Sequence, residues 1–343
     1  MRITKLLMVL FFSIGISGQE TILNIGHRGA MGHEPENTLA SIKKAIDLGA
    51  DGFEIDVFKC LSGEIVLFHD KYLDKLTDGE GLIEKKSLID LKKLSVLGTE
   101  NKIPTLEEVL NIINKQVFLN IGHRGAMGHE PENTIVSIKK AIDLGADGFE
   151  IDVFRCMSGE IVLFHDKQLD KLTNGEGLIE EKSLKDLKKL SVLGTENKIP
   201  TLEEVLNIIN KQIFLNIELK GKNTAKASLE LVEKFINQKK ISSQNILFSS
   251  FDWNELEKLR ELNSDVKIAL ITENDPLLAI ETAKKLKAFA INPNYKDLNK
   301  GNIKIIHKNN FKIYTWTVNN KRDISKMKSF KVDGIITDFP DRF

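Results

Sequence analysis

The chain is poor in several features that define large classes of protein. It has only two cysteines in 343 residues, Cys60 and Cys156, which are too few for a disulfide framework and are best interpreted as small packed residues. It has no excess of charge, because 49 Lys and Arg balance 49 Asp and Glu. The composition therefore gives no electrostatic reason to expect a nucleic acid or an anionic membrane as a partner. No Walker-type Gly-rich loop is present, which argues against a nucleotide kinase or ATPase.

The apolar run at the N-terminus is too short for a stable membrane span. Two positive charges in residues 1–5 precede the run Leu6–Ile16, and the small residue Gly18 follows it. This pattern predicts a secretory signal peptide over residues 1–19, cleaved near Gly18 or Gln19, and hence a secreted or periplasmic protein. The alternative is an uncleaved N-terminal anchor. No Cys follows the run, which argues against a lipid-anchored protein.

A repeat decides the layout of the chain. Residues 23–118 match residues 119–214 at an offset of 96, and 87 of the 96 positions are identical. Two near-identical copies do not make a solenoid. Only the second copy runs on into Glu218-Leu219-Lys220. We therefore interpret residues 20–118 as a partial duplicate of the first third of a domain that occupies residues 119–343. In the alternative layout the first copy fills the domain and the second loops out, which needs an unusually long connection.

Strand and helix patterns alternate through residues 119–343. If a hairpin strand at 161–164 is set aside, eight strands are separated by helices, which is the count of an α/β (β/α)₈ barrel, the TIM barrel. With about three strands, the first copy cannot close a barrel and would expose strand edges. The predicted strands are 119–122, 148–154, 213–219, 246–250, 266–271, 289–292, 313–318 and 334–337. The predicted helices include 134–144, 183–190, 201–210, 224–236, 253–261 and 276–286.

Three acidic residues fall at the ends of predicted barrel strands, where enzymes of this fold carry their active sites. Glu150 and Asp152 are two residues apart on one strand, so their side chains point to the same side. Glu218 ends the next barrel strand. Three converging carboxylates predict a hard divalent cation, Ca²⁺ or Mg²⁺, rather than zinc. The alternative is a strand of ordinary surface salt bridges.

Two histidines are expected beside these carboxylates. His123 directly follows the first strand. A hairpin turn centred between Ser158 and Gly159 would place His165 opposite Asp152. Two imidazoles near a metal can serve as general acid and general base.

Two basic residues lie on the strands that flank the carboxylates. Arg124 and Lys220 would clamp a phosphate, Arg124 by a two-pronged guanidinium and Lys220 as a point charge. Hydrolysis of a phosphodiester needs this charge, because negative charge builds on the phosphoryl oxygens as the bond breaks.

The order and spacing of these residues resemble the glycerophosphodiester phosphodiesterase family over essentially all of residues 119–343. The motifs that carry the resemblance are His123-Arg124-Gly125, Pro131-Glu132-Asn133-Thr134, Glu150-x-Asp152, His165-Asp166, Glu218-x-Lys220, Trp316-Thr317-Val318-Asn319 and Asp333-Gly334-Ile335-Ile336-Thr337-Asp338.

The resemblance implies a metal-dependent TIM-barrel enzyme that hydrolyses small glycerophosphodiesters to glycerol 3-phosphate and an alcohol. It also implies that the glycerol 2-hydroxyl attacks phosphorus and that water opens the resulting cyclic phosphate. A small insertion is expected over the hairpin and residues 167–198. The implied roles are metal binding by Glu150, Asp152 and Glu218, acid–base catalysis by His123 and His165, phosphate binding by Arg124 and Lys220, and a substrate-pocket wall at Trp316.

The first copy departs from the family pattern. It lacks a Glu-Leu-Lys sequence of its own, so we expect its site to be incomplete. The matching residues are His27, Arg28, Glu54, Asp56 and His69. Two other functions compete with the main prediction. A phospholipase D-like lipid phosphodiesterase would need an apolar lip for acyl chains. A surface domain inactivated by the duplication would lack turnover, although every catalytic residue type is present once in full.

Overall fold

The computed structural model describes residues 6–11, 23–116 and 118–343. They form two compact units, residues 1–117 and 118–343, each of which is described by itself. Most of the signal peptide predicted for residues 1–19 lies outside the described residues. The part that is described, Leu6–Phe11, forms strand β1. No helix in the described ranges has the length and apolar content needed to cross a membrane.

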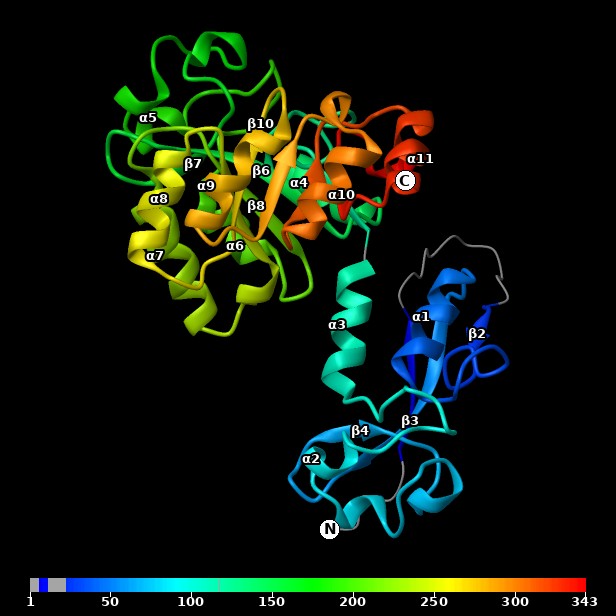
Figure 1. Ribbon diagram of the computed structural model, residues 1–343. Coiled ribbons are helices and arrows are strands. Elements are labelled where there is room, and N and C mark those ends of the chain that lie inside the picture. Colours follow the sequence, from blue (N-terminus) through cyan, green and yellow to red (C-terminus); the bar gives the residue numbers. More distant parts are fainter. Residues whose placement is uncertain (1–5, 12–22, 117) are drawn as a thin grey trace. The chain divides into compact units, whose positions relative to one another are not determined.

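The second unit is a closed barrel of eight parallel strands, as the sequence pattern predicts (Figure 1). The strands follow one another around the barrel in the order β5, β6, β8, β9, β10, β11, β12 and β13, and β13 pairs with β5 to close it. Strand β7 pairs antiparallel with β6 outside this circuit. The bounds are β5 Leu119–Gly122, β6 Gly148–Arg155, β7 Ile161–Leu163, β8 Phe214–Leu219, β9 Ile246–Ser250, β10 Ile268–Thr272, β11 Ala290–Pro293, β12 Lys312–Thr315 and β13 Gly334–Thr337.

Helices surround the barrel strands, with α7 and α8 side by side on the outside (Figure 1). Helix α4 begins after Thr134, whose side chain accepts a hydrogen bond from the Ser137 backbone, while the Ser137 side chain accepts one in return. Short 3₁₀ turns and helix α5 form the predicted insertion after β7. The bounds are α4 Ile135–Asp143, α5 Leu184–Leu187, α6 Leu202–Ile208, α7 Thr224–Asn237, α8 Trp253–Leu262, α9 Ile280–Lys285, α10 Lys300–Lys308 and α11 Lys321–Phe330.

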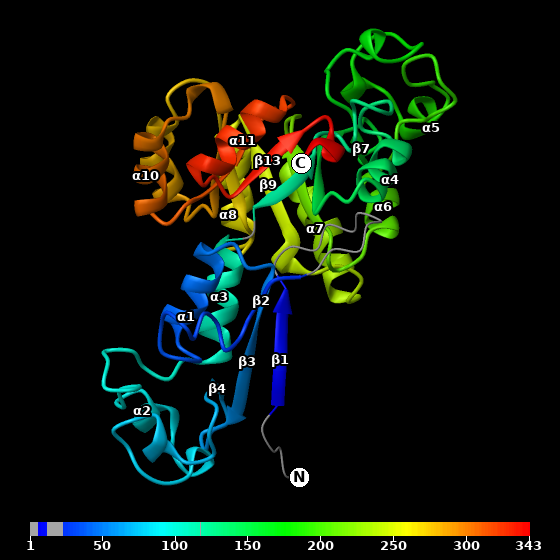
Figure 2. The same cartoon turned by 90° about the vertical axis from the view of Figure 1, so that its right-hand side faces the viewer.

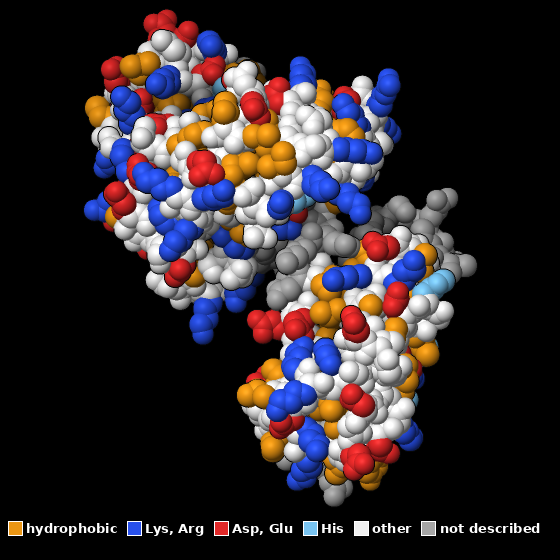
Figure 3. Space-filling model, in the orientation of Figure 1, with side chains coloured by type: hydrophobic (Ala, Val, Ile, Leu, Met, Phe, Trp, Pro, Cys, Tyr) orange, Lys and Arg blue, Asp and Glu red, His pale blue; other side chains and the backbone are white. Residues whose placement is uncertain are grey.

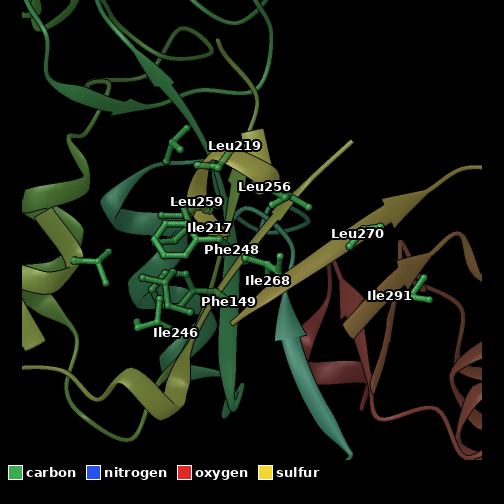
Figure 4. Close-up of a cluster of buried hydrophobic side chains, with 14 of the residues drawn as sticks. Phe149, Ile217, Leu219, Ile246, Phe248, Leu256, Leu259, Ile268, Leu270 and Ile291 are labelled. Carbon is green, nitrogen blue, oxygen red and sulfur yellow. The ribbon is translucent and has the colours of Figure 1, made fainter. Parts of the chain in front are cut away.

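The pleat of the strands separates two apolar layers. Outward-facing residues such as Phe149, Ile217 and Phe248 pack with Leu256 and Leu259 of α8 in the layer between strands and helices (Figure 4). Each fully buried side chain of this size contributes roughly 1.5–3 kcal/mol to stability. Inward-facing residues fill one end of the barrel, and the polar residues at the strand ends lie above this filling. The inner group is Ile121, Phe214, Leu247, Ala269, Ala290, Tyr314 and Ile336.

The insertion has a small core of its own, which includes Cys156. Cys156 is buried, carries a free thiol and packs with Phe154 and Val162. Cys60 is likewise buried and free in the first unit. Both cysteines are therefore small packed residues, as their low number predicts. On the face of the barrel unit seen in Figure 3, Lys and Arg side chains are interspersed with Asp and Glu.

The hairpin register differs by one residue from the prediction. The turn is centred on Ser158, with Gly159 in the left-handed conformation at φ +105°, and the Cys156 amide donates to the Glu160 carbonyl. As a result Val153 pairs with Leu163, and Asp152 lies opposite Phe164 rather than opposite His165. The predicted strand 313–318 is also too long, because β12 ends at Thr315.

The first unit contains an open sheet in the order β1–β3–β2, with β4 also paired to β3 (Figure 2). Strand β1 runs antiparallel to β3, with Leu6 opposite Val57 and Phe11 opposite Gly52. Residues 52–57 correspond to 148–153 in the barrel, which pair with β8. The backbone of β1 thus covers the edge that β8 covers in the complete barrel. The bounds are β2 Ile25–Gly26, β3 Gly52–Lys59, β4 Ile65–Leu67, α1 Leu39–Asp47, α2 Leu88–Leu91 and α3 Leu106–Gln116.

Deletion of residues 23–118 should leave the barrel intact, since every strand pairing of the barrel joins residues within 119–343. We expect the shortened chain to unfold cooperatively with a Tm within about 2 °C of the barrel transition of the full chain. Differential scanning calorimetry of both proteins checks this. Loss of the cooperative transition would show that the barrel depends on the first copy.

Candidate active site

Strand register brings the three predicted metal ligands together. Asp152 on β6 is the register partner of Glu218 on β8, and Glu150 lies two residues before Asp152 on the same face. One ligand oxygen from each of the three carboxylates lies within 4.8 Å of the others. Glu150 and Asp152 are 3% and 1% exposed, so their charges are compensated by protein groups or a cation rather than by solvent.

The pKa values of the three carboxyl groups are shifted in different directions. Burial, reinforced by the neighbouring Asp152 and Glu218, raises the pKa of Glu150 well above its ordinary value. Burial and Asp152 raise the pKa of Glu218 to about 7, against the opposing effect of Lys220. Burial also acts on Asp152, but Arg124 and Lys220 outweigh it and lower its pKa. The protein's own cations therefore favour the charged form of Asp152 most strongly, whereas burial and mutual repulsion dominate at Glu150 and Glu218.

Arg124 is held by a tight loop after β5. It has a left-handed backbone conformation, φ +50°, which costs an L-residue about 1–2 kcal/mol. Gly125 follows at φ +82°, and a Cβ there would lie 2.5 Å from the Ser137 backbone. In this conformation the Arg124 amide donates to Glu150 Oε2 at 3.0 Å. The loop geometry thus places Arg124 against the predicted metal ligands.

The Arg124 guanidinium bridges two carboxylates. Its Nε lies 3.0 Å from Asp152 Oδ2, and its Nη1 lies 2.6 Å from Glu132 Oε1. The Asn133 side chain donates to the same Asp152 oxygen at 2.9 Å. Glu132 and Asn133 belong to a motif quoted for the resemblance, but sequence reasoning gave them no role in the site. They orient Arg124 and Asp152.

Lys220 lies on the other side of Asp152. Its Nζ is 2.9 Å from Glu218 Oε1 and 3.7 Å from Asp152 Oδ1. Burial alone would lower its pKa, but Glu218 and Asp152 raise it above the ordinary value. Lys220 therefore stays charged, and two cations flank the carboxylate cluster as the sequence predicts.

His123 is oriented by a residue far away in the chain. Its Nδ1 lies 2.6 Å from Oδ1 of Asp338, the residue that directly follows β13. Asn319 donates to the other Asp338 oxygen at 2.5 Å and accepts from the Asp338 amide at 2.9 Å. Burial opposes the charge of Asp338, but the His123 contact and Asn319 lower its pKa. Sequence reasoning placed Asp338 at a strand end without a role, because the pairing with His123 depends on barrel closure.

His165 is oriented locally. Its Nδ1 lies 2.8 Å from Oδ1 of the neighbouring Asp166. Burial lowers the pKa of His165, although Asp152 partly opposes that effect. Since Nδ1 of each imidazole faces a carboxylate, Nε2 is the nitrogen available for other contacts.

A cavity of about 120 Å³ joins these groups and is smaller than the roughly 300–1,000 Å³ typical of drug-sized ligands. At its rim, Phe251 and Trp316 contact edge to face, with centroids 5.5 Å apart, and Phe251 is 45% exposed. The cavity contains seven of the eight residues predicted for the site, while Asp152 lies behind them in the carboxylate cluster. Its lining is His123, Arg124, Glu150, His165, Asn216, Glu218, Lys220, Phe251, Ile271, Asn292, Trp316, Thr317 and Ile336.

The carboxylate cluster fits a hard divalent cation. Its donors are all carboxylate oxygens, the ligands that Ca²⁺ and Mg²⁺ prefer. Glu150 Oε1 is buried and has no hydrogen-bond partner among the described residues. A cation would satisfy that oxygen and offset the repulsion between the carboxylates.

The first unit repeats part of this arrangement. Arg28 Nε lies 3.3 Å from Asp56, its amide donates to Glu54, and His27 lies 3.8 Å from Glu54. His69 pairs with Asp70 at 3.5 Å. Within the described ranges, a cluster of three acidic or metal-binding side chains occurs only in the barrel. The first copy therefore holds two carboxylates without a third.

Comparison with known proteins identifies relatives of this chain. The glycerophosphodiester phosphodiesterase of Caldanaerobacter subterraneus subsp. tengcongensis is 35% identical over 232 residues, covering 65% of this chain and 95% of the relative. The structure of an Oleispira antarctica phosphodiesterase in complex with the product sn-glycerol-3-phosphate superimposes with a TM-score of 0.60 at 28% identity, covering 65% of this chain and 93% of that one. A Thermotoga maritima glycerophosphodiester phosphodiesterase gives a TM-score of 0.54 at 27% identity, with 64% and 94% coverage.

The profile of one family matches both copies. The match to the glycerophosphoryl diester phosphodiesterase family covers residues 27–122 and 123–342. Together with the closed barrel and the acidic cluster at its mouth, this match leads to one conclusion. The chain belongs to the glycerophosphoryl diester phosphodiesterase family.

Proposed function

We propose that this protein hydrolyses glycerophosphodiesters to glycerol 3-phosphate and an alcohol, with one divalent cation, Ca²⁺ or Mg²⁺. The observation that carries the proposal is the cluster of Glu150, Asp152 and Glu218 beside Arg124 and Lys220. The solved relative that contains sn-glycerol-3-phosphate as a product supports the same substrate class. The predicted signal peptide supports a secreted or periplasmic location.

In this mechanism the protein's cations bind and orient the phosphodiester. Arg124 and Lys220 stay charged in the buried site, so they can neutralise phosphoryl oxygens. A divalent cation held by the three carboxylates would supply further positive charge for the developing negative charge. Because the cavity is small and partly enclosed, these charges act more strongly than they would in bulk water.

The two imidazoles move the protons. Asp338 and Asp166 face Nδ1 of His123 and His165, so Nε2 of one ring can take a proton from the attacking glycerol 2-hydroxyl. Nε2 of the other ring can return a proton to the leaving alcohol oxygen. The cyclic phosphate that this attack forms is then opened by water, with the same two rings removing a proton from water and returning one to the 2-oxygen, which gives glycerol 3-phosphate. Both rings line the cavity that also contains Arg124 and Lys220.

A lipid substrate is the second candidate because of the exposed Phe251 beside Trp316 at the rim. The small cavity favours the compact substrate, since the rim pair offers little apolar surface for an acyl chain. Parallel assays with glycerophosphocholine and lysophosphatidylcholine separate the two functions. Faster turnover of the lysolipid would favour the phospholipase D-like activity. Absence of turnover with both substrates would favour an inactive surface domain.

Metal removal should abolish activity and lower stability. Chelation should remove turnover, and adding Ca²⁺ or Mg²⁺ at about 100 times the Kd should raise unfolding free energy by about 2.7 kcal/mol. For a barrel of this size, that corresponds to a Tm increase of several degrees. We expect E150Q to lose the metal-dependent Tm increase and the matched first-copy variant E54Q to keep it. An unchanged Tm increase in E150Q would contradict the assigned ligands.

His165→Ala should lower kcat by roughly 10²–10⁴-fold, because it removes one partner in proton transfer. The matched variant His69→Ala changes the same residue type in the first copy and should leave kcat unchanged. Circular dichroism checks that both variants fold. Equal losses in the two variants, or full turnover by His165→Ala, would refute the acid–base assignment.

Asp338→Asn should lower kcat by roughly 10²–10⁴-fold with little change in KM, because Asp338 fixes the tautomer and orientation of His123. The matched control is Asp341→Asn, because Asp341 lies on the same terminal segment as Asp338 and also pairs with a histidine. Its Oδ1 lies 2.7 Å from Nε2 of His129 in an exposed pair outside the cavity lining. Steady-state kinetics measure both parameters. A KM effect alone would assign Asp338 to substrate binding instead.

A further inference from the structure

Three uncharged polar residues lie two positions along their strands from the apolar residues that fill the barrel. Asn216, Ser249 and Asn292 each follow an inward-facing apolar residue by two positions, namely Phe214, Leu247 and Ala290. All three are at most 2% exposed. Their side chains therefore project into the barrel just below the catalytic groups.

These residues carry unpaired hydrogen-bonding atoms. Asn292 has no partner for either Oδ1 or Nδ2 among the described residues, and Asn216 Oδ1 and Ser249 Oγ are unpaired as well. Buried polar groups are nearly always hydrogen-bonded, because an unpaired one loses its hydration without compensation. Asn216 and Asn292 line the same cavity as the metal and phosphate residues. Both residues therefore border the space where substrate would bind.

Barrel topology places Asn292 across from the charged groups. It lies on β11, which is four strands from β6 in either direction around the barrel, and β6 carries Glu150. The Trp316 indole donates to the backbone carbonyl of Asn292 at 2.8 Å, which connects this strand to the cavity wall. The cavity thus has a charged side, on β5, β6 and β8, and an uncharged amide on the opposite side.

The chemistry of the unpaired atoms indicates what they bind. A phosphate offers only acceptors, which the unpaired oxygen of Asn216 would repel, and an alkyl group would leave every amide atom unpaired. A hydroxyl both donates and accepts, and Asn292 offers both roles whichever way its amide is turned. We propose that Asn292, assisted by Asn216, binds the hydroxyl groups of the glycerol moiety and makes the site selective for a polyol phosphodiester. This inference rests on the proposed function and adds the residue that recognises its substrate class.

The test compares two ligands that differ only in hydroxyl groups. They are sn-glycerol 3-phosphate and n-propyl phosphate, measured by calorimetry on the full chain with Mg²⁺ or Ca²⁺ present. We expect the unaltered protein to bind sn-glycerol 3-phosphate at least about tenfold more tightly, because sites built to pair hydroxyls reject analogues that lack them. Asn292→Leu should reduce that ratio to near one and leave the affinity for n-propyl phosphate unchanged.

Controls separate recognition from folding. Ser228 is fully buried on α7 with an unpaired hydroxyl but does not line the cavity, so Ser228→Ala should keep the discrimination. Asn292→Ala provides a second variant if the leucine does not fit. Equal weakening of both ligands, or a retained preference for sn-glycerol 3-phosphate in the folded variants, would overturn the inference. Hydrolysis of glycerophosphocholine by the unaltered protein is measured in parallel, so failure of the proposed function shows itself separately.

Discussion

The site depends on three carboxylates that the barrel forces together. Register between β6 and β8 sets Asp152 beside Glu218, and the pleat adds Glu150 on the same face. Buried like charges repel one another. Removing the opposite charge that pairs with a buried charged group costs several kcal/mol. Arg124 and Lys220 lower the pKa of Asp152, whereas burial and the neighbouring carboxylates raise the pKa values of Glu150 and Glu218. A divalent cation held by the three carboxylates would offset their mutual repulsion.

The duplication shows that local sequence does not make this site by itself. Residues 52–57 and 148–153 are identical, and the Arg28–Asp56 pair repeats the Arg124–Asp152 pair. The third carboxylate comes from β8, which pairs with β6 of the second copy. In the first unit the matching edge is covered by β1, which runs antiparallel. The site therefore requires the neighbouring strand as well as the motif that both copies share.

Much of the fold and the charged part of the site could be predicted from the sequence. Alternating apolar strands and amphipathic helices indicate the barrel, and residues placed two apart or at strand ends indicate the convergence of Glu150, Asp152 and Glu218. The hairpin register could not be fixed, since it depends on Gly159 adopting a left-handed conformation and moving the turn centre to Ser158. The Asp338–His123 pair joins residues 215 positions apart and exists only after the barrel closes. The unpaired atoms of Asn292 likewise become visible only when its surroundings are known.

The most direct test of the account is the position of the bound cation. Crystals of the full chain grown with Mn²⁺ as a substitute for Mg²⁺ should show one strong anomalous peak, within about 2.0–2.6 Å of oxygens from Glu150, Asp152 and Glu218. A peak beside Glu54 and Asp56 in place of the barrel site, or a bound ion that does not contact Glu218, would contradict the central claim.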